Sequence, residues 1–365
     1  MPTSPPAASS ARPSFPPAHL GDEFTPRTTY LNTASHGLLP ARTTAALAAA
    51  VAEMAEGRAD LAVYGERAGE ARAAYAGVVG IPAERVALGS SVAVHVALVA
   101  HALPSGAEVL AVDGDFASLV TPFAVRRDLK LRSVPLEELA GAVRPGTALV
   151  AVSAAQSADG RVADLAAVGA AARAHGARLL VDTTQSTGWL PLEPDVADYT
   201  VCGAYKWLLC PRGVSFLTVP GDGGGLEPLH AGWVAGEDLW NSTYGPVTEL
   251  ARSARRFDES PPHLPYLGAA ASLGLVAGLG VEAIGRHNRA LAARFRAGVA
   301  GLGRPAVPAD SPIVAVPGLG AATGALAREG IRVADRAGHL RAAFHLYNTD
   351  ADVDRLLEAL AAHVR

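Results

Sequence analysis

One lysine stands out by its surroundings and by the rarity of its type. Lysine occurs at only two of the 365 positions, Lys130 and Lys206. Lys206 follows the β-rich run YTVCG at 199–203 and has apolar neighbours, where desolvation lowers the pKa of an amine. A desolvated amine can form a Schiff base with a carbonyl compound. Lys206 is therefore a candidate covalent attachment point, the alternative being a surface lysine whose charge reaches solvent.

A carboxylate ends another β-rich run, RLLVD at 178–182. This run is too apolar to hold Asp182 without a partner, so a buried cation is expected beside the carboxylate. A protonated pyridine nitrogen would serve, and its protonation makes the ring an electron sink. On this segment alone, an aspartate that only caps the next turn is an equally good interpretation.

Small and hydroxyl residues gather where the run RVAL at 85–88 ends. Gly89, Ser90 and Ser91 precede the helical stretch VAVHVALVAH. Exposed amides at a helix N-terminus, together with two hydroxyls, suit an anion such as phosphate. A serine N-cap without a ligand is the alternative for an isolated motif of this kind.

The elements that position these residues alternate in type. From about residue 85, short β-rich runs are separated by Ala-rich helical stretches, which predicts an α/β fold with a mainly parallel sheet. We expect seven strands, of which one edge strand is antiparallel because no long helix separates the last two runs. In such a sheet ligands bind at the carboxyl ends of the strands. The seven runs lie at 85–88, 108–113, 130–135, 148–153, 178–182, 199–203 and 214–219.

The pattern changes past Pro261. A helical stretch from Tyr266 to Leu302 precedes strand candidates at 313–316, 331–333 and 341–347. We therefore predict a large domain at 26–260, with an N-terminal segment that contacts the small domain, and a smaller C-terminal α/β domain at 261–365. The Pro- and Ser-rich residues 1–25 are expected to be a disordered tail and not a signal peptide.

Composition excludes several function classes. The net charge is -4, which leaves no excess of basic residues for nucleic acid or an anionic membrane. No apolar run reaches the roughly 20 residues of a membrane span. The two cysteines favour a reducing cytoplasm. No spacing typical of a metal site or of a nicotinamide-binding loop is present.

Three segments, in order and spacing, resemble the class V aminotransferase family of fold-type I pyridoxal-phosphate enzymes. They are VDTTQSTGW, GAYKWLLCPRGVSFL and HLRAAFHLYNTDADVDRLLEAL, and the resemblance runs from YLNTASHGLLP near residue 30 to the C-terminus. The family includes cysteine desulfurases, selenocysteine lyases and kynureninases. The resemblance implies pyridoxal 5′-phosphate as cofactor and a small amino acid as substrate.

The resemblance also implies roles for individual residues. Lys206 would form the Schiff base, Asp182 would hold the pyridine nitrogen, and Gln185 would lie near the phenolic oxygen. Arg341 would clamp the substrate carboxylate through two parallel hydrogen bonds. The other implied contacts are Ser90, Ser91 and Tyr205 to the phosphate, Phe116 stacked on the ring, Ser157 near the ring oxygen, and Asn32, Ser35 and His36 over the substrate.

The chain departs from the desulfurases in three places. It has Gly203-Ala204-Tyr205-Lys206 where most of them carry Ser-x-His-Lys before the Schiff base. The loop that carries their nucleophilic cysteine is missing from RAGHLRAAFHLYNT, and the cysteines present, Cys202 and Cys210, lie on apolar segments typical of buried thiols. Persulfide formation is therefore not expected. The threonine that makes the family's inter-subunit phosphate contact is absent, and Ser260 in RRFDESPPHLPYLG is the nearest hydroxyl. Family architecture then implies a homodimer with shared active sites.

These observations favour an aminotransferase. A β-eliminating C–S or C–Se lyase of the same family is the first alternative, because the two reactions differ only in how the scissile bond is aligned and where the proton returns. A pyridoxal-phosphate-binding protein without turnover is the second. Four tryptophans, Trp189, Trp207, Trp233 and Trp240, are candidates for pocket walls.

Overall fold

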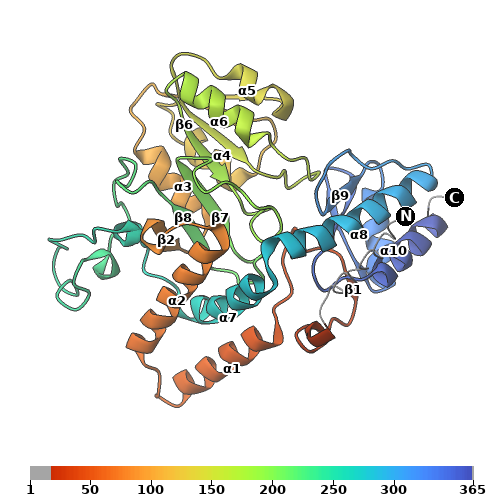
Figure 1. The fold of residues 1–365 in the computed structure, drawn as a ribbon, viewed down its shortest axis with the longest axis horizontal. Coiled ribbons are helices and arrows are strands. Elements are labelled where there is room, and N and C mark those ends of the chain that lie inside the picture. Colours follow the sequence, from red (N-terminus) through yellow and green to blue (C-terminus); the bar gives the residue numbers. More distant parts are fainter. Residues whose placement is uncertain (1–17, 364–365) are drawn as a thin grey trace, which may run out of the picture.

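The computed structural model describes residues 18–363, and its larger part is built on a seven-stranded sheet (Figure 1). The strand order is β2-β8-β7-β6-β5-β3-β4. The mainly parallel sheet and the number of strands predicted from the sequence are confirmed. The strands are β2 Val86–Gly89, β3 Glu108–Val112, β4 Lys130–Val134, β5 Thr147–Ser153, β6 Arg178–Asp182, β7 Tyr199–Gly203 and β8 Ser215–Thr218.

The antiparallel strand is not at the edge, so that part of the prediction is wrong. β8 pairs antiparallel with both β2 and β7, whereas the other neighbouring strands run parallel. The connection from β7 to β8 has no crossover helix, which fixes β8 antiparallel beside β7. β2, which comes first in the chain among the seven strands of this sheet, then pairs with the outer side of β8 and forms the edge.

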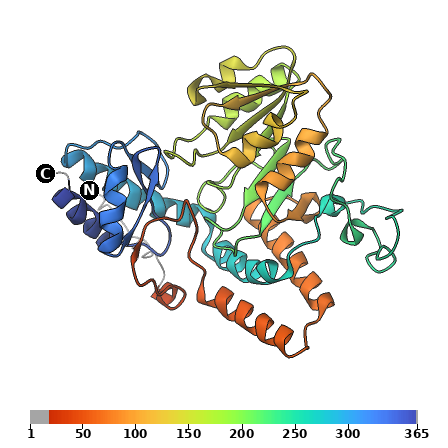
Figure 2. The same ribbon diagram turned by 180° about the vertical axis from the view of Figure 1, so that it is seen from behind.

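Helices cover both faces of this sheet (Figures 1 and 2). Alternate residues of β5 point to opposite faces of the sheet. Leu149 and Ala151 pack with α3 and α4 on one face, whereas Val150 and Val152 pack with α5 and α6 on the other. Near β2, β7 and β8, α2 and α7 share a third apolar cluster. The helices are α1 Ala41–Ala55, α2 Leu61–Val79, α3 Val92–His101, α4 Ala117–Ala124, α5 Leu139–Ala142, α6 Leu165–Ala174 and α7 His263–Leu279.

One buried ion pair ties α2 to the segment that precedes α7. Arg72 Nη2 lies 2.6 Å from Asp258 Oδ2, with side-chain exposures of 15% and 3%. Asp258 Oδ1 also accepts the amide of Leu88 at 2.8 Å. Burial raises the pKa of Asp258, while Arg72 opposes that shift. This pair fixes residues 257–259 beside the carboxyl end of β2.

We expect Arg72→Ala to destabilise the protein by about 3–5 kcal/mol, because the variant leaves the Asp258 carboxylate buried without its charge partner. Urea denaturation measures the loss. Arg67→Ala on the same helix is the control, since Arg67 pairs with Glu70 at an exposed site, and its cost should stay below about 1 kcal/mol. Equal losses in the two variants would contradict the structural role of the buried pair.

The smaller domain has its own three-stranded antiparallel sheet, in the order β11-β12-β9, and its own apolar core. β12 ends at Ala343, four residues earlier than the strand predicted at 341–347, because the chain turns there toward the large domain. The elements are α8 Val281–Gly301, β9 Ile313–Val316, α9 Thr323–Arg328, β10 Ile331–Arg332, β11 Ala334–Arg336, β12 His339–Ala343 and α10 Asp350–His363.

The helical stretch predicted at 266–302 is two helices. α7 packs on α1 and α2, α8 packs on β9 and α10, and the two helices meet at Gly280 with a bend of 81°. We therefore place the division between the domains at this bend, one helix later than residue 260. Within residues 18–363 no single helix is long and apolar enough to span a membrane, and α7 with α8 meets that test only as a bent pair.

The N-terminal segment joins the small domain to the large one (Figure 2). β1, Thr29–Tyr30, pairs parallel with β10, and Gly37 N donates to Tyr205 O at 2.9 Å. Residues 18–22 form the 3-10 helix η1, and the buried ring of Phe24 packs on Tyr347. The disorder predicted as far as residue 25 is therefore wrong from residue 18 onward, and residues 1–17 lie outside the described part.

Short 3-10 helices complete the described elements. They are η2 Ala83–Arg85, η3 Leu136–Glu138, η4 Trp233–Ala235, η5 Ala254–Phe257 and η6 Gly320–Ala322.

Candidate active site

Lys206 lies just past the carboxyl end of β7 and is 3% exposed. Burial lowers the pKa of its amine to about 8, and the attraction of Asp182 offsets part of that effect. The N-terminal segment passes close to the Lys206 backbone at Gly37. A Cβ on Gly37 would lie 2.2 Å from Lys206 O, so only glycine fits there. A buried amine with this pKa is a nucleophile near neutral pH.

The pH dependence of the amine's reactivity follows from this shift. In protein freed of cofactor, attachment of a reactive aldehyde at Lys206 should speed up about tenfold per pH unit below pH 8 and level off above it, because only the unprotonated amine attacks. Stopped-flow absorption at several pH values measures this rate. Asp182→Asn should move the midpoint lower, since the carboxylate holds the pKa up. A midpoint that stays above pH 10 would contradict the burial argument.

Asp182 ends β6, the strand next to β7, and is also 3% exposed. Its Oδ1 accepts the Thr184 amide at 2.8 Å, and burial raises the pKa of the carboxyl. Thr184 Oγ1 in turn accepts the Gly203 amide at 2.9 Å, which fixes this turn to β7. Within residues 18–363 Asp182 forms no ion pair, so the carboxylate can accept a buried cation.

Gln185 is held in a fixed orientation from several sides. Its Oε1 accepts Trp207 Nε1 at 2.8 Å, and its backbone oxygen accepts Trp189 Nε1 at 2.7 Å. Its Nε2 donates to Ala34 O and to Ser157 Oγ, both at 2.9 Å. The structure thus brings Gln185 and Ser157 together, and two of the tryptophans act as supports for Gln185.

Arg341 on β12 brings the small domain into the site. Its Nη2 donates to Ser35 Oγ at 2.7 Å, and its Nη1 donates to the backbone oxygen of Ser157 and, at 3.2 Å, to Ser157 Oγ. The side chain is 1% exposed, and burial, followed by the nearby charge of Arg336, lowers the pKa of Arg341 to about 9. Its Nε has no hydrogen-bond partner, and no carboxylate pairs with the guanidinium in the described part of the chain. A buried cation of this kind is suited to an anionic ligand.

Two aromatic rings flank the Lys206 amine. The Nζ atom lies 5.0 Å from the ring centroid of Phe116 and 5.6 Å from that of Tyr205. Phe116 caps α4 and is 42% exposed, which leaves a flat apolar face available. Arg212 lies over the other ring, 4.4 Å from the Tyr205 centroid, and burial raises the pKa of Tyr205. An aromatic ligand ring can pack on such a face.

The predicted phosphate contacts lie two strands away at the same sheet edge. Gly89 of β2 and Gly203 of β7 both pair with Ser215 of β8. Ser91 caps α3, is exposed and makes no side-chain cap bond, so its hydroxyl is available at the helix N-terminus. Ser90 is engaged: its amide and hydroxyl donate to Glu259 Oε2 at 2.9 and 2.7 Å.

Three other residues predicted for the site, His36, Asn32 and Ser260, have no contact in the described part of the chain that assigns them a role. The carbonyl of His36 accepts the Tyr30 hydroxyl, and the His36 ring lies 6.0 Å from that of Tyr205. Asn32 Oδ1 is buried and has no hydrogen-bond partner among residues 18–363. Ser260 is exposed beside Glu259, so its predicted phosphate contact from a neighbouring subunit stays a prediction.

Sequence reasoning missed several contributors. Asp115 accepts the amide and hydroxyl of Ser153 at 2.9 and 2.6 Å, and its charge raises the pKa of Asp182. Arg336 donates to Ser35 Oγ at 3.0 Å. Asp115 could have been predicted from its position just after the β3 run. Glu259 and Arg336 could not, because their contacts join segments that lie far apart in the sequence.

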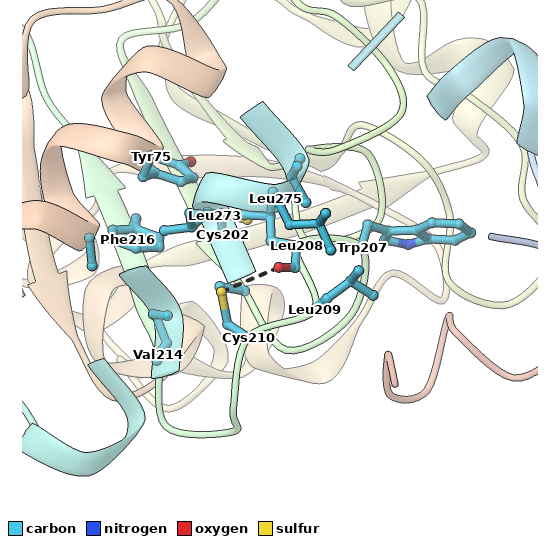
Figure 3. Close-up of a cluster of buried hydrophobic side chains, with 14 of the residues drawn as sticks. Tyr75, Cys202, Trp207, Leu208, Leu209, Cys210, Val214, Phe216, Leu273 and Leu275 are labelled. Carbon is cyan, nitrogen blue, oxygen red and sulfur yellow. Dashed lines mark hydrogen bonds between the residues drawn. The ribbon is translucent and has the colours of Figure 1, made fainter. Parts of the chain in front are cut away.

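The two cysteines lie in an apolar cluster, and the two remaining tryptophans contact each other. Figure 3 shows Cys202 and Cys210 within an apolar cluster, with Cys210 Sγ donating to Leu208 O at 3.4 Å. Burial raises the pKa of Cys202 to about 12, and that of Cys210 well above its ordinary value. Trp233 and Trp240 pair with each other, 6.3 Å between ring centroids, and their role as pocket walls stays a prediction.

The residues present fit one kind of cofactor. Four features meet at the carboxyl edge of a mainly parallel sheet. They are a buried amine, a buried carboxylate that forms no ion pair within residues 18–363, an aromatic face and a helix N-terminus. These are the groups that hold the aldehyde, the pyridinium nitrogen, the ring and the phosphate of pyridoxal phosphate. Fold and site together define a fold-type I pyridoxal-phosphate enzyme.

The chain belongs to the aminotransferase class-V family, whose model matches residues 69–316, and pyridoxal phosphate is its cofactor. An uncharacterized aminotransferase of Bacillus subtilis is 26% identical over 94% of this chain and 98% of that protein. The isopenicillin N epimerase of Amycolatopsis lactamdurans is 29% identical over 80% of this chain and 83% of that protein.

Solved structures share the fold. The cystine C–S lyase C-DES, in complex with cysteine persulfide, has a TM-score of 0.83 at 24% identity and covers 92% of this chain and 97% of its own. An apo cysteine desulfurase from Thermococcus onnurineus NA1 has a TM-score of 0.79 at 22% identity, with coverages of 92% and 94%.

Proposed function

We propose that this pyridoxal-phosphate enzyme is an aminotransferase that acts on a small amino acid. The observation that carries the proposal is the buried Arg341, which lacks an anionic partner in the described part of the chain and shares Ser157 with Gln185 beside the Lys206 turn. A substrate α-carboxylate would complete its charge pairing through two parallel hydrogen bonds.

Each residue then has a defined task. Lys206 would bond the cofactor and, once released, move the proton at the substrate Cα as general base. Asp182 would keep the ring nitrogen protonated, and Phe116 would support the ring. When bound, the cofactor supplies an electron sink for the negative charge that develops at Cα.

The state of the thiols supports leaving a persulfide-forming reaction out of the proposal. A nucleophilic cysteine must be exposed and partly ionised, whereas Cys202 and Cys210 are both buried with raised pKa values. Loss of a β-leaving group needs no protein thiol, so the β-eliminating lyase is kept as an outcome of the test.

The test is incubation of the holoenzyme with single amino acids. If the proposal is right, one of them should yield its keto acid in an amount equal to the pyridoxamine form of the cofactor, without free ammonia. Ammonia and pyruvate together, with no pyridoxamine form, would replace the aminotransferase with the β-lyase. Binding of the cofactor without any product would leave the inactive binding protein.

We also propose a homodimer in which Ser260 reaches the neighbouring active site. Ser260 is exposed and follows Glu259, which binds the predicted phosphate contact Ser90, and this placement supports the arrangement. Light scattering on the purified protein should give twice the 37.2 kDa chain mass, and a monomer that retains full activity would contradict shared sites.

A further inference from the structure

A carboxylate lies against the predicted phosphate contacts. Glu259 Oε2 accepts both the amide of Ser90, at 2.9 Å, and its hydroxyl, at 2.7 Å. The Glu259 amide donates to Leu88 O at 3.1 Å, so backbone and side chain both bind the turn between β2 and α3. The adjacent pair of Asp258 with Arg72 fixes this segment in place.

The charges around Glu259 do not neutralise it. Arg72 and Arg255 act on Asp258, and within residues 18–363 Glu259 forms no ion pair. His95 of α3 is buried, and in the described part of the chain neither of its ring nitrogens has a hydrogen-bond partner. Burial lowers the pKa of His95 to about 4, although the Ser215 backbone and the charge of Glu259 oppose that shift, so the His95 ring is neutral at neutral pH. The Glu259 carboxylate therefore lies against donors suited to a phosphate without an ion-pair partner among residues 18–363.

We propose that Glu259 competes with the cofactor's phosphate for Ser90. The phosphate and the carboxylate need the same two donors and repel each other, so Glu259 must release Ser90, or the phosphate must bind through Ser91 alone beside a like charge. In either case the chain binds pyridoxal phosphate less tightly than the same site without this charge would. Glu259 thus sets how readily the cofactor exchanges, a property beyond the reaction proposed above.

The test compares cofactors with and without a phosphate. The full-length protein is freed of cofactor by dialysis, and dissociation constants for pyridoxal phosphate and for pyridoxal are measured by visible absorption. Glu259→Gln keeps the shape and removes the charge, and it should tighten binding of pyridoxal phosphate by about tenfold while leaving pyridoxal unchanged. Glu259→Ala should also tighten binding of the phosphorylated form alone.

Two controls keep the result specific. Glu358→Gln removes an exposed charge on α10 and should change neither constant, and thermal unfolding checks that each variant is folded. Unchanged or weaker binding of pyridoxal phosphate in both Glu259 variants would overturn the proposal. Equal tightening of both compounds would overturn it too, because the effect would then act on the ring and not on the phosphate.

Discussion

Alanine in place of Lys206 should abolish covalent cofactor attachment and lower kcat by about 10⁴-fold or more, since the variant loses both the attachment point and the general base. The amine is 3% exposed with a pKa of about 8, and Lys130, the only other lysine, lies on a different strand, β4. Visible absorption after dialysis reports attachment, and steady-state turnover of the best amino acid reports catalysis.

The matched control is Lys130→Ala. Lys130 is exposed at the start of β4, so the variant should keep its absorption band and its activity within about twofold. Added methylamine should restore part of the activity of Lys206→Ala, because a small amine can enter the space left by the side chain and carry the proton. Turnover of that variant at the rate of the unmodified protein would exclude Lys206 from the chemistry.

Much of the large domain could be predicted because its strands are buried on both faces. The runs ALVAV at 148–152 and LLV at 179–181 are apolar throughout, and a parallel sheet that is covered on both faces buries such runs. Polar residues that end these strands, such as Asp182, then stand out. The place of β8 could not be predicted in the same way, because its pairing with β2 joins residues more than 120 positions apart.

The site was predictable where one segment carries its own signal. Lys206 is one of two lysines and has apolar neighbours in the sequence. Asp182 ends a strand, and Gln185 follows three residues later. Glu259 carries no such signal, because its importance arises only when η5 and the turn after β2 come together in space. The bend at Gly280 was missed for a related reason: the apolar pattern continues through α7 and α8 although their packing partners change.

The partners of Arg341 lead to the second prediction with a large effect. Arg341→Ala should raise KM for the amino-acid substrate by roughly 150-fold, equivalent to about 3 kcal/mol for a lost buried charge pair, with a smaller change in kcat. Ser35 and Ser157 keep their places through other bonds, to Arg336 and Gln185, so the loss should fall on substrate binding. Steady-state kinetics of the variant against the unmodified protein measure both constants.

A substrate analogue separates a carboxylate clamp from a structural role. The analogue is the amine that corresponds to the substrate without its carboxylate. It should react poorly with the unmodified protein and equally poorly with Arg341→Ala, because it has no carboxylate for Arg341 to bind. Arg304→Ala, at an exposed position outside the site, should leave the preference for the amino acid intact. If Arg341→Ala still prefers the amino acid over the amine by the original factor, another group binds the carboxylate, and the small domain's part in substrate recognition would have to lie elsewhere than β12.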